Sequence, residues 1–97
     1  MKKIDRLKKI LAAHRSELRQ EHKIKRIGIF GSYVRGEQKK KSDIDILVEF
    51  SDAVSLLDWI GAENYLTDLL GIKVDLVPRE DVIPELLKRI FKEVVYV

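Results

Sequence analysis

The chain has 97 residues, 45% hydrophobic and 36% charged, which is enough for one small core and for a single domain spanning 1–97. It contains no cysteine, which excludes a disulfide framework and a thiolate metal site. No apolar run approaches the roughly 18 residues that span a bilayer, and the polar N-terminus does not resemble a signal peptide. We therefore expect a cytoplasmic protein that crosses no membrane.

The net charge is only +3, but the charges are unevenly distributed. Residues 1–41 carry 14 Lys and Arg against 4 Asp and Glu, a net of +10, whereas residues 42–97 carry 5 against 12, a net of −7. Basic stretches of this kind are most often solvated surface. A basic half that meets phosphates or an acidic partner is the alternative.

The first part of the chain predicts a helix, a strand and a turn. Apolar residues recur at helical spacing over 3–21, which predicts one amphipathic helix. Residues 24–30 (IKRIGIF) are rich in β-formers and predict a strand that ends at Gly31. Residues 32–36 predict a short helical turn, and residues 37–42 (EQKKKS) predict a loop because they contain no apolar residue.

The second part predicts two more strands separated by a helix. Residues 43–50 (DIDILVEF) alternate between an apolar face and a face that carries acids. A capping-box pattern at Ser55 starts the helix, and Gly71 ends it. Residues 72–77 (IKVDLV) alternate again, and Pro78 stops that strand.

The last predicted helix begins at Pro84, a residue suited to a first helical turn. Its inward positions are expected to be Leu86, Leu87, Ile90 and Phe91. The tail 93–97 (EVVYV) has three alternatives, because it can fray, extend the helix or add an edge strand. Helices that flank short strands predict an α/β or α+β domain with a short mixed sheet.

Acids two residues apart on a strand are the strongest chemical signal in the chain. Asp43 and Asp45 project from the same face and repel each other unless a cation lies between them. Mg²⁺ suits such a site because it divides its coordination between a few carboxylates, waters and substrate phosphates. Asp75 adds a third carboxylate if its strand adjoins the first. An ordinary solvent-facing strand edge is the alternative for an isolated D-x-D.

The Gly31-Ser32 pair follows a strand and leads into a helical turn. Glycine lets the backbone approach a ligand closely, free N–H groups at such a turn favour a phosphate, and Ser32 adds a hydroxyl donor. Arg35, one turn further on, is either a bidentate phosphate ligand or a structural salt-bridge residue. Ser42 fits the cap of a turn better than a nucleotide ligand.

The segment GSYVRGEQKKKSDIDILVEF resembles the signature of the nucleotidyltransferase superfamily that includes DNA polymerase β. In chain length and in the residues of the motif it is most similar to the minimal nucleotidyltransferases (MNT). Their pattern is Gly-Ser, ten residues and Asp-x-Asp, with Arg-Gly after the Ser, a Ser before the first Asp and a third acid on a later strand. The chain matches this pattern over nearly its whole length, at Gly31, Ser32, Arg35, Gly36, Ser42, Asp43, Asp45 and Asp75.

This resemblance implies a nucleotidyltransferase fold and a role for each matched position. Asp43, Asp45 and Asp75, called the three acids below, would be catalytic and would bind Mg²⁺, as two ions. The nucleotide ATP would be bound by Gly31, Ser32, Arg35 and Ser42.

The resemblance also implies the acceptor. This would be a tyrosine of the cognate HEPN ribonuclease toxin, which a type VII-like antitoxin modifies with AMP. Two alternatives stay open: an antitoxin that neutralises its partner by binding alone, and nucleotide transfer to RNA or a small molecule. The short chain and the modest net charge count against a nucleic-acid partner.

Overall fold

Four strands form one mixed sheet in the order β3-β2-β1-β4. The computed structural model describes residues 3–97. The central strand β1 (Ile24–Phe30) runs antiparallel to both β2 (Ile44–Phe50) and β4 (Val95–Tyr96). At the edge of the sheet opposite β4, β2 pairs in parallel with β3 (Val74–Pro78). The expected mixed sheet is therefore confirmed.

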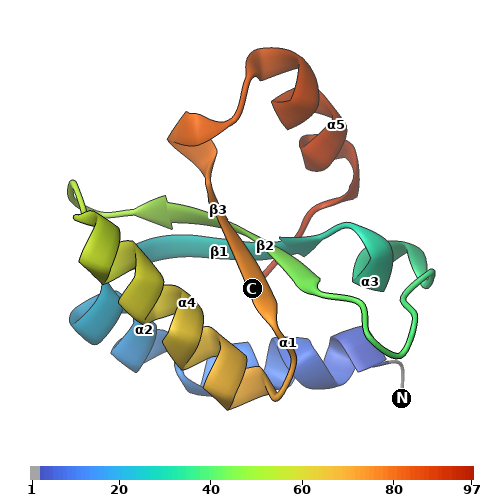
Figure 1. Cartoon of the computed structure of the whole chain (residues 1–97), viewed down its shortest axis with the longest axis horizontal. Helices are drawn as coiled ribbons and strands as arrows, with labels where there is room; N and C mark the ends of the chain where they lie inside the picture. The colour runs from blue at the N-terminus through green and yellow to red at the C-terminus, as the bar shows by residue number, and fades with distance from the viewer. Residues whose placement is uncertain (1–2) are drawn as a thin grey trace.

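Helices lie on both faces of this sheet (Figure 1). One face is covered by α1 (Lys3–Ala13), α2 (Arg15–His22) and α4 (Leu56–Leu70). On the other face stands α5 (Pro84–Glu93), preceded by the 3₁₀ turn η1 (Arg79–Asp81), while the short α3 (Ser32–Arg35) follows β1. No helix within residues 3–97 is long and apolar enough to span a bilayer.

The core lies between the sheet and the three helices α1, α2 and α4. Alternate residues of the strands contribute one side of it, as the sequence pattern predicts. The helices contribute the other side, so that apolar surface from both layers leaves water together. The buried members include Ile29, Ile44, Ile46, Val48, Leu76, Leu7, Leu11, Leu18, Ala62 and Leu66.

The predicted single helix over 3–21 is wrong, because His14 divides it into α1 and α2. His14 has φ −108° and ψ 16°, outside the helical region. Its Nδ1 bonds to the carbonyl oxygen of Ile10 at 2.9 Å, and that carbonyl is the acceptor a continuous helix would offer to the His14 backbone N–H. The displaced N–H donates instead to Leu11 at 3.2 Å. A side-chain bond thus competes with the helical ladder at this point.

Helix α4 makes the parallel pairing of β2 with β3 possible, because parallel neighbours need a crossover connection. Its predicted limits are confirmed. The Ser55 hydroxyl accepts from the Asp58 N–H at 3.1 Å, and the Asp58 carboxylate accepts from the Ser55 N–H at 3.2 Å. At the other end Gly71 adopts φ 69°, the left-handed geometry that closes a helix.

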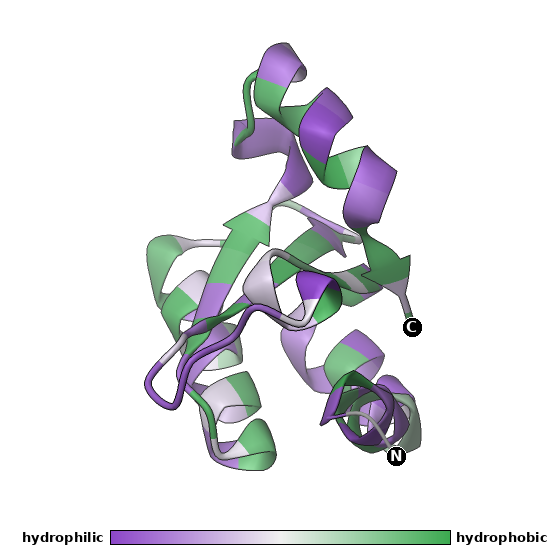
Figure 2. Cartoon of the chain, turned by 90° about the vertical axis from the view of Figure 1, so that its right-hand side faces the viewer, coloured by the Kyte–Doolittle hydropathy of each residue, from purple (hydrophilic) through white to green (hydrophobic). Residues whose placement is uncertain are grey.

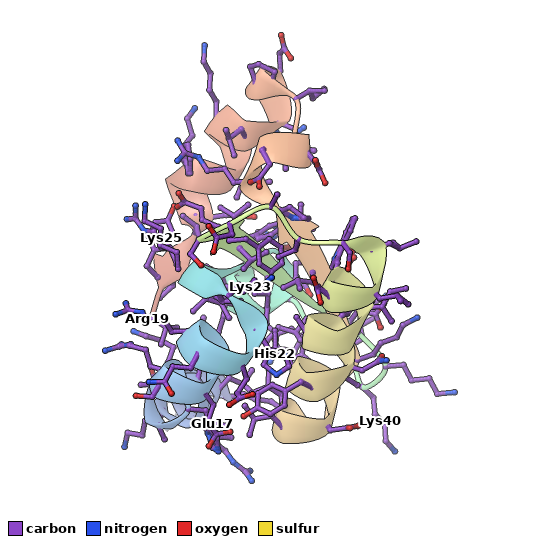
Figure 3. All side chains as sticks on the ribbon, turned by 90° about the vertical axis from the view of Figure 1, so that its left-hand side faces the viewer. Glu17, Arg19, His22, Lys23, Lys25 and Lys40 are labelled. Atoms are coloured by element: carbon purple, nitrogen blue, oxygen red, sulfur yellow. The ribbon has the colours of Figure 1, made fainter. Side chains whose placement is uncertain are left out.

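Helices α2 and α4 are joined by a polar and aromatic contact. The Tyr65 hydroxyl donates to Glu17 at 2.5 Å, and the Tyr65 ring lies 4.5 Å from the His22 ring. Figure 3 shows Glu17 and His22 on the side of α2 that faces α4. The hydrogen bond to Glu17 is the main cause that raises the pKa of Tyr65 to about 12. The contact links α2 to α4 on the core face of the sheet.

Helix α5 buries less than the sequence predicts. Ile90 is buried, but Leu86 and Phe91 are 46% and 41% exposed, so the expectation that they point inward is wrong. Figure 2 shows the reason, since α5 projects away from the sheet along much of its length. The helix ends at Glu93, and the tail forms β4, the edge-strand alternative. Room for β4 comes from Gly28, where a Cβ would lie 2.6 Å from Val94.

Candidate functional site

Asp45 and Asp75 are direct partners in the parallel pairing of β2 with β3. The residues on either side of each acid belong to the core, namely Ile44 and Ile46 for Asp45 and Val74 and Leu76 for Asp75. By strand alternation both carboxylates therefore leave the opposite face, on the α5 side. Paired residues on adjacent strands lie about 5 Å apart. The two strands adjoin, which is the condition on which Asp75 adds a third carboxylate to the site. Asp43 is exposed and lies just outside β2, which begins one residue later than predicted.

The charges of the three acids act on one another at Asp45. Burial raises the pKa of the half-buried Asp45, and the negative charges of Asp75 and Asp43 raise it further. A cation between these groups would relieve that repulsion. Within residues 3–97, no group of three or more potential ligands is arranged closely enough to hold a metal ion. Carboxylate oxygens are ligands that suit Mg²⁺, but the three acids are not arranged as a complete metal site.

The Gly-Ser turn lies directly against Asp45. Phe30, the last residue of β1, is the strand partner of Asp45, and Gly31 follows it. Gly31 has φ 84°, and a Cβ at this position would collide with the Asp45 carboxylate. Glycine is therefore required both for its backbone conformation and for its close approach. The predicted phosphate-binding turn and the predicted metal ligands are thus brought together.

Three side chains of α4 hold the strand that carries Asp75. The Thr67 hydroxyl accepts from the Val74 N–H at 3.1 Å, and Glu63 accepts from the Leu76 N–H at 2.9 Å. The Trp59 indole N–H donates to the Leu76 carbonyl at 3.1 Å. These bonds satisfy the outer edge of β3 on both sides of Asp75, so the edge is closed to further strand pairing. Sequence reasoning missed this role, because it depends on the crossover.

The loop before β2 is anchored by a buried tyrosine. The Tyr33 hydroxyl donates to the Ser42 carbonyl at 3.3 Å, and the Ser42 hydroxyl accepts from the Lys39 N–H at 2.7 Å. Ser42 therefore closes a turn next to Asp43, the geometry that the sequence favoured for it. Burial, and secondarily the charge of Asp43, raises the pKa of Tyr33.

Arg35 makes salt bridges to two carboxylates. Its Nε lies 2.6 Å from Glu37, and its Nη1 lies 3.0 Å from both carboxylate oxygens of Glu93. Glu93 also accepts from the Gly31 N–H at 3.0 Å. No local pattern predicts this role of Glu93, because Glu93 falls in the tail 93–97, for which the sequence allows three structures.

Comparison with known proteins agrees with this geometry. A family model described as a nucleotidyltransferase domain matches residues 11–97. The protein adenylyltransferase MntA of Thermococcus cleftensis is 48% identical over 94 residues, which are 97% of this chain and 95% of that protein. A candidate protein adenylyltransferase of Methanocaldococcus jannaschii is 47% identical over 98 residues, the whole of both chains.

Solved structures give the same result. A structure described as a minimal nucleotidyltransferase superposes with a TM-score of 0.75 at 33% identity, over 92% of this chain and 93% of the other. A toxin–antitoxin structure with AMP-PNP gives a TM-score of 0.73 at 28% identity, over 93% of this chain and 70% of the other. From its motif, its fold and these similarities, the chain belongs to the minimal nucleotidyltransferases of the nucleotidyltransferase domain family.

Proposed function

We propose that this chain is a Mg²⁺-dependent protein adenylyltransferase that transfers AMP from ATP to a tyrosine of a cognate HEPN-domain toxin, and that it acts as the antitoxin of that pair. The observation that carries the proposal is that Asp45 pairs with Asp75 on the neighbouring strand and lies against the Gly31 turn. This arrangement supports a metal site next to a phosphate site. Both halves are needed to bind a metal–triphosphate complex.

Two comparisons support the acceptor and the donor. The relative from Thermococcus cleftensis carries the name protein adenylyltransferase, and its similarity covers nearly the whole chain. The toxin–antitoxin structure that shares this fold was solved with AMP-PNP, an ATP analogue. A HEPN ribonuclease as the toxin is what the family resemblance implies.

The residues of the site have distinct roles in this proposal. Asp45 and Asp75, with Asp43 from the loop, would hold Mg²⁺, which supplies charge that neutralises the triphosphate and promotes loss of the hydroxyl proton. Gly31 and Ser32 would donate hydrogen bonds to the β- and γ-phosphates, aided by the candidate ligands Arg35 and Ser42. Catalysis then rests on positioning and charge neutralisation.

The transfer step exchanges one phosphorus–oxygen bond for another. The tyrosine oxygen forms a bond to the α-phosphorus, and the bond from that phosphorus to the oxygen bridging to the β-phosphate breaks. Pyrophosphate leaves with that oxygen. Asp75 is exposed on the strand beside Asp45, which suits it to take the proton of the attacking hydroxyl. Exposure of Asp43 and Asp75 leaves the site open to an acceptor as large as a protein.

The proposal is tested by incubating the chain with the cognate toxin, Mg²⁺ and ATP labelled at the α-phosphate. We expect label on the toxin and a loss of at least about 10³-fold in the double variant Asp43→Asn/Asp45→Asn, because its metal ligands are removed. Asp52→Asn, an exposed acid beyond the end of β2, is the matched control. Absence of label with the wild-type chain, or label that survives the double variant, would exclude this function.

The same variants separate the alternatives. An antitoxin that acts by binding alone would still silence the toxin in cells when Asp43 and Asp45 are both asparagine. Transfer to RNA would appear as label on RNA, with an affinity that falls steeply as salt rises.

A further inference from the structure

Glu93 occupies the groups that a bound triphosphate would need. One of its carboxylate oxygens accepts from the Gly31 N–H at 3.0 Å. The same oxygen and its partner oxygen both lie 3.0 Å from Nη1 of Arg35. Gly31 and Arg35 are the backbone and side-chain donors assigned above to the phosphates. A carboxylate and a phosphate are both oxyanions, and they cannot use the same donors at the same time.

The carboxylate comes from a part of the fold remote in sequence, 62 residues beyond Gly31. Glu93 is the last residue of α5, and the Val94 N–H that follows it still bonds to the Ile90 carbonyl at 2.8 Å. Its side chain is 26% exposed, whereas the Arg35 side chain is 49% exposed. The contact therefore closes the C-terminal helix onto the Gly-Ser turn and shields the carboxylate from water.

A second carboxylate on Arg35 offers an internal comparison. Glu37 bonds to Nε of Arg35 at 2.6 Å and is more exposed than Glu93, at 59%. Glu37 has no bond to Gly31 among the hydrogen bonds of residues 3–97. The two glutamates thus share one guanidinium, but only Glu93 blocks the turn.

We propose that Glu93 is an internal competitor of the triphosphate and so determines the affinity of the site for nucleotide. This inference rests on the proposed nucleotide site. In the closed state Glu93 holds the donors of the Gly-Ser turn, and a metal–triphosphate complex binds only after this carboxylate has moved away. The apparent dissociation constant is then the intrinsic one divided by the fraction of molecules with Glu93 released.

The variant Glu93→Gln tests this directly. Glutamine keeps the shape and an acceptor oxygen, but it loses the charge that pairs with Arg35. We expect Mg²⁺–AMP-PNP to bind about five- to tenfold more tightly to Glu93→Gln, because one charge-assisted contact no longer competes. Inorganic tripolyphosphate with Mg²⁺ should show the same gain, since the competition concerns phosphates and not the base. Glu37→Gln should bind either probe within about twofold of wild type.

A measurement on the unaltered chain removes any dependence on how the variant folds. Hydrogen exchange of wild type with and without Mg²⁺–AMP-PNP should show faster exchange at the end of α5, over 90–94. The turn at 31–32 should be protected instead, because phosphates replace Glu93 there. Protection of both segments on nucleotide addition would contradict the proposal.

The outcomes separate this proposal from the proposed function. Equal or weaker binding in Glu93→Gln overturns the competitor role even if AMP transfer proceeds, and it would instead assign Glu93 to supporting the turn. Failure of every variant to bind either probe also overturns it, because removing the carboxylate would have uncovered no anion site. Tighter binding in Glu93→Gln without transfer of AMP to the toxin supports the competitor role and rejects the adenylyltransferase.

Discussion

Adjacent residues of β2 point to opposite faces of the sheet, and these two faces differ in burial and in charge. Ile46 is fully buried in the core that α1, α2 and α4 cover. Asp45, the residue before it, points to the opposite face, where it meets Asp75. Helix α5 stands on that face but projects away from the sheet (Figure 2), and its residues Leu86 and Phe91 are exposed.

This difference shows that stability and chemistry are placed on separate faces. The core face gains free energy by removing apolar surface from water. The acid face costs free energy, because burial and the charges of Asp75 and Asp43 disfavour the ionised form of Asp45. Sites that depart from folding preference in this way are where function is expected. Substitutions at neighbouring positions should therefore separate activity from stability.

The largest effect is expected at Asp75 on the acid face. Asp75→Asn should lower the rate of AMP transfer to the toxin by about 10³-fold, because it removes a metal ligand and the candidate proton acceptor. Stability should hardly change, since Asp75 is exposed. Rates with labelled ATP and thermal unfolding measure the two properties. Glu80→Gln, an exposed acid in η1, is the control, and a similar loss of rate there would remove the special role of Asp75.

On the core face the expected effect is on stability. Ile46→Ala should lower the free energy of unfolding by about 2–5 kcal/mol, because it leaves a cavity in a fully buried position. Urea unfolding measures this loss. Leu57→Ala, at a position 79% exposed on α4, should change stability by less than about 0.5 kcal/mol. Equal losses at the two positions would mean that the burial difference between them is not maintained in solution.

Most of the core face could be predicted from the sequence, because it depends on local patterns. The β-formers of 24–30 and the alternation in 43–50 predicted the strands, and the caps at Ser55 and Gly71 predicted α4. Alternation alone does not settle whether the strands of Asp45 and Asp75 adjoin, because it assigns a residue to a face of the sheet but not a strand to its neighbour.

What the sequence did not predict depends on particular side-chain and tertiary contacts, most of them between distant residues. The Glu93 carboxylate reaches Gly31 only because α5 and β4 return beside β1. The exposure of Phe91 follows from how far α5 leans from the sheet, which no periodicity encodes. The break at His14 is local but depends on one side-chain bond, to Ile10, which hydrophobic spacing does not predict.

Gly31 bears on both faces, because it directly follows the core strand β1 and lies against Asp45. Gly31→Ala should destabilise the chain by about 1–3 kcal/mol through its positive φ, and it should also displace the Asp45 carboxylate and weaken binding of Mg²⁺. Gly61→Ala is the matched control, since a Cβ there meets nothing within 4 Å inside α4. That change should stabilise by about 0.5–1 kcal/mol. Unfolding and metal titration of both variants measure these effects.

The smallest expected effect is a gain of stability at Asp45. Its pKa is raised in the folded chain, above an ordinary value of 3.8, so the fold binds this proton more tightly than the unfolded chain does. The stabilisation from that proton is complete below the ordinary pKa and is lost as the pH rises through the raised one. In metal-free buffer near neutral pH, Asp45→Asn should therefore be more stable than wild type.

The extra stability of Asp45→Asn over wild type should shrink as the pH falls through the raised pKa of Asp45, and it should disappear below the ordinary pKa. Thermal unfolding in the presence of a chelator, at pH values from mildly acidic to neutral, measures it, with Asp52→Asn as the exposed control. Added Mg²⁺ should then stabilise wild type but not Asp45→Asn, because binding to the folded state adds free energy only where the ligands remain. A variant less stable than wild type at neutral pH would mean that Asp45 supports the fold, and that the two faces do not divide stability from chemistry.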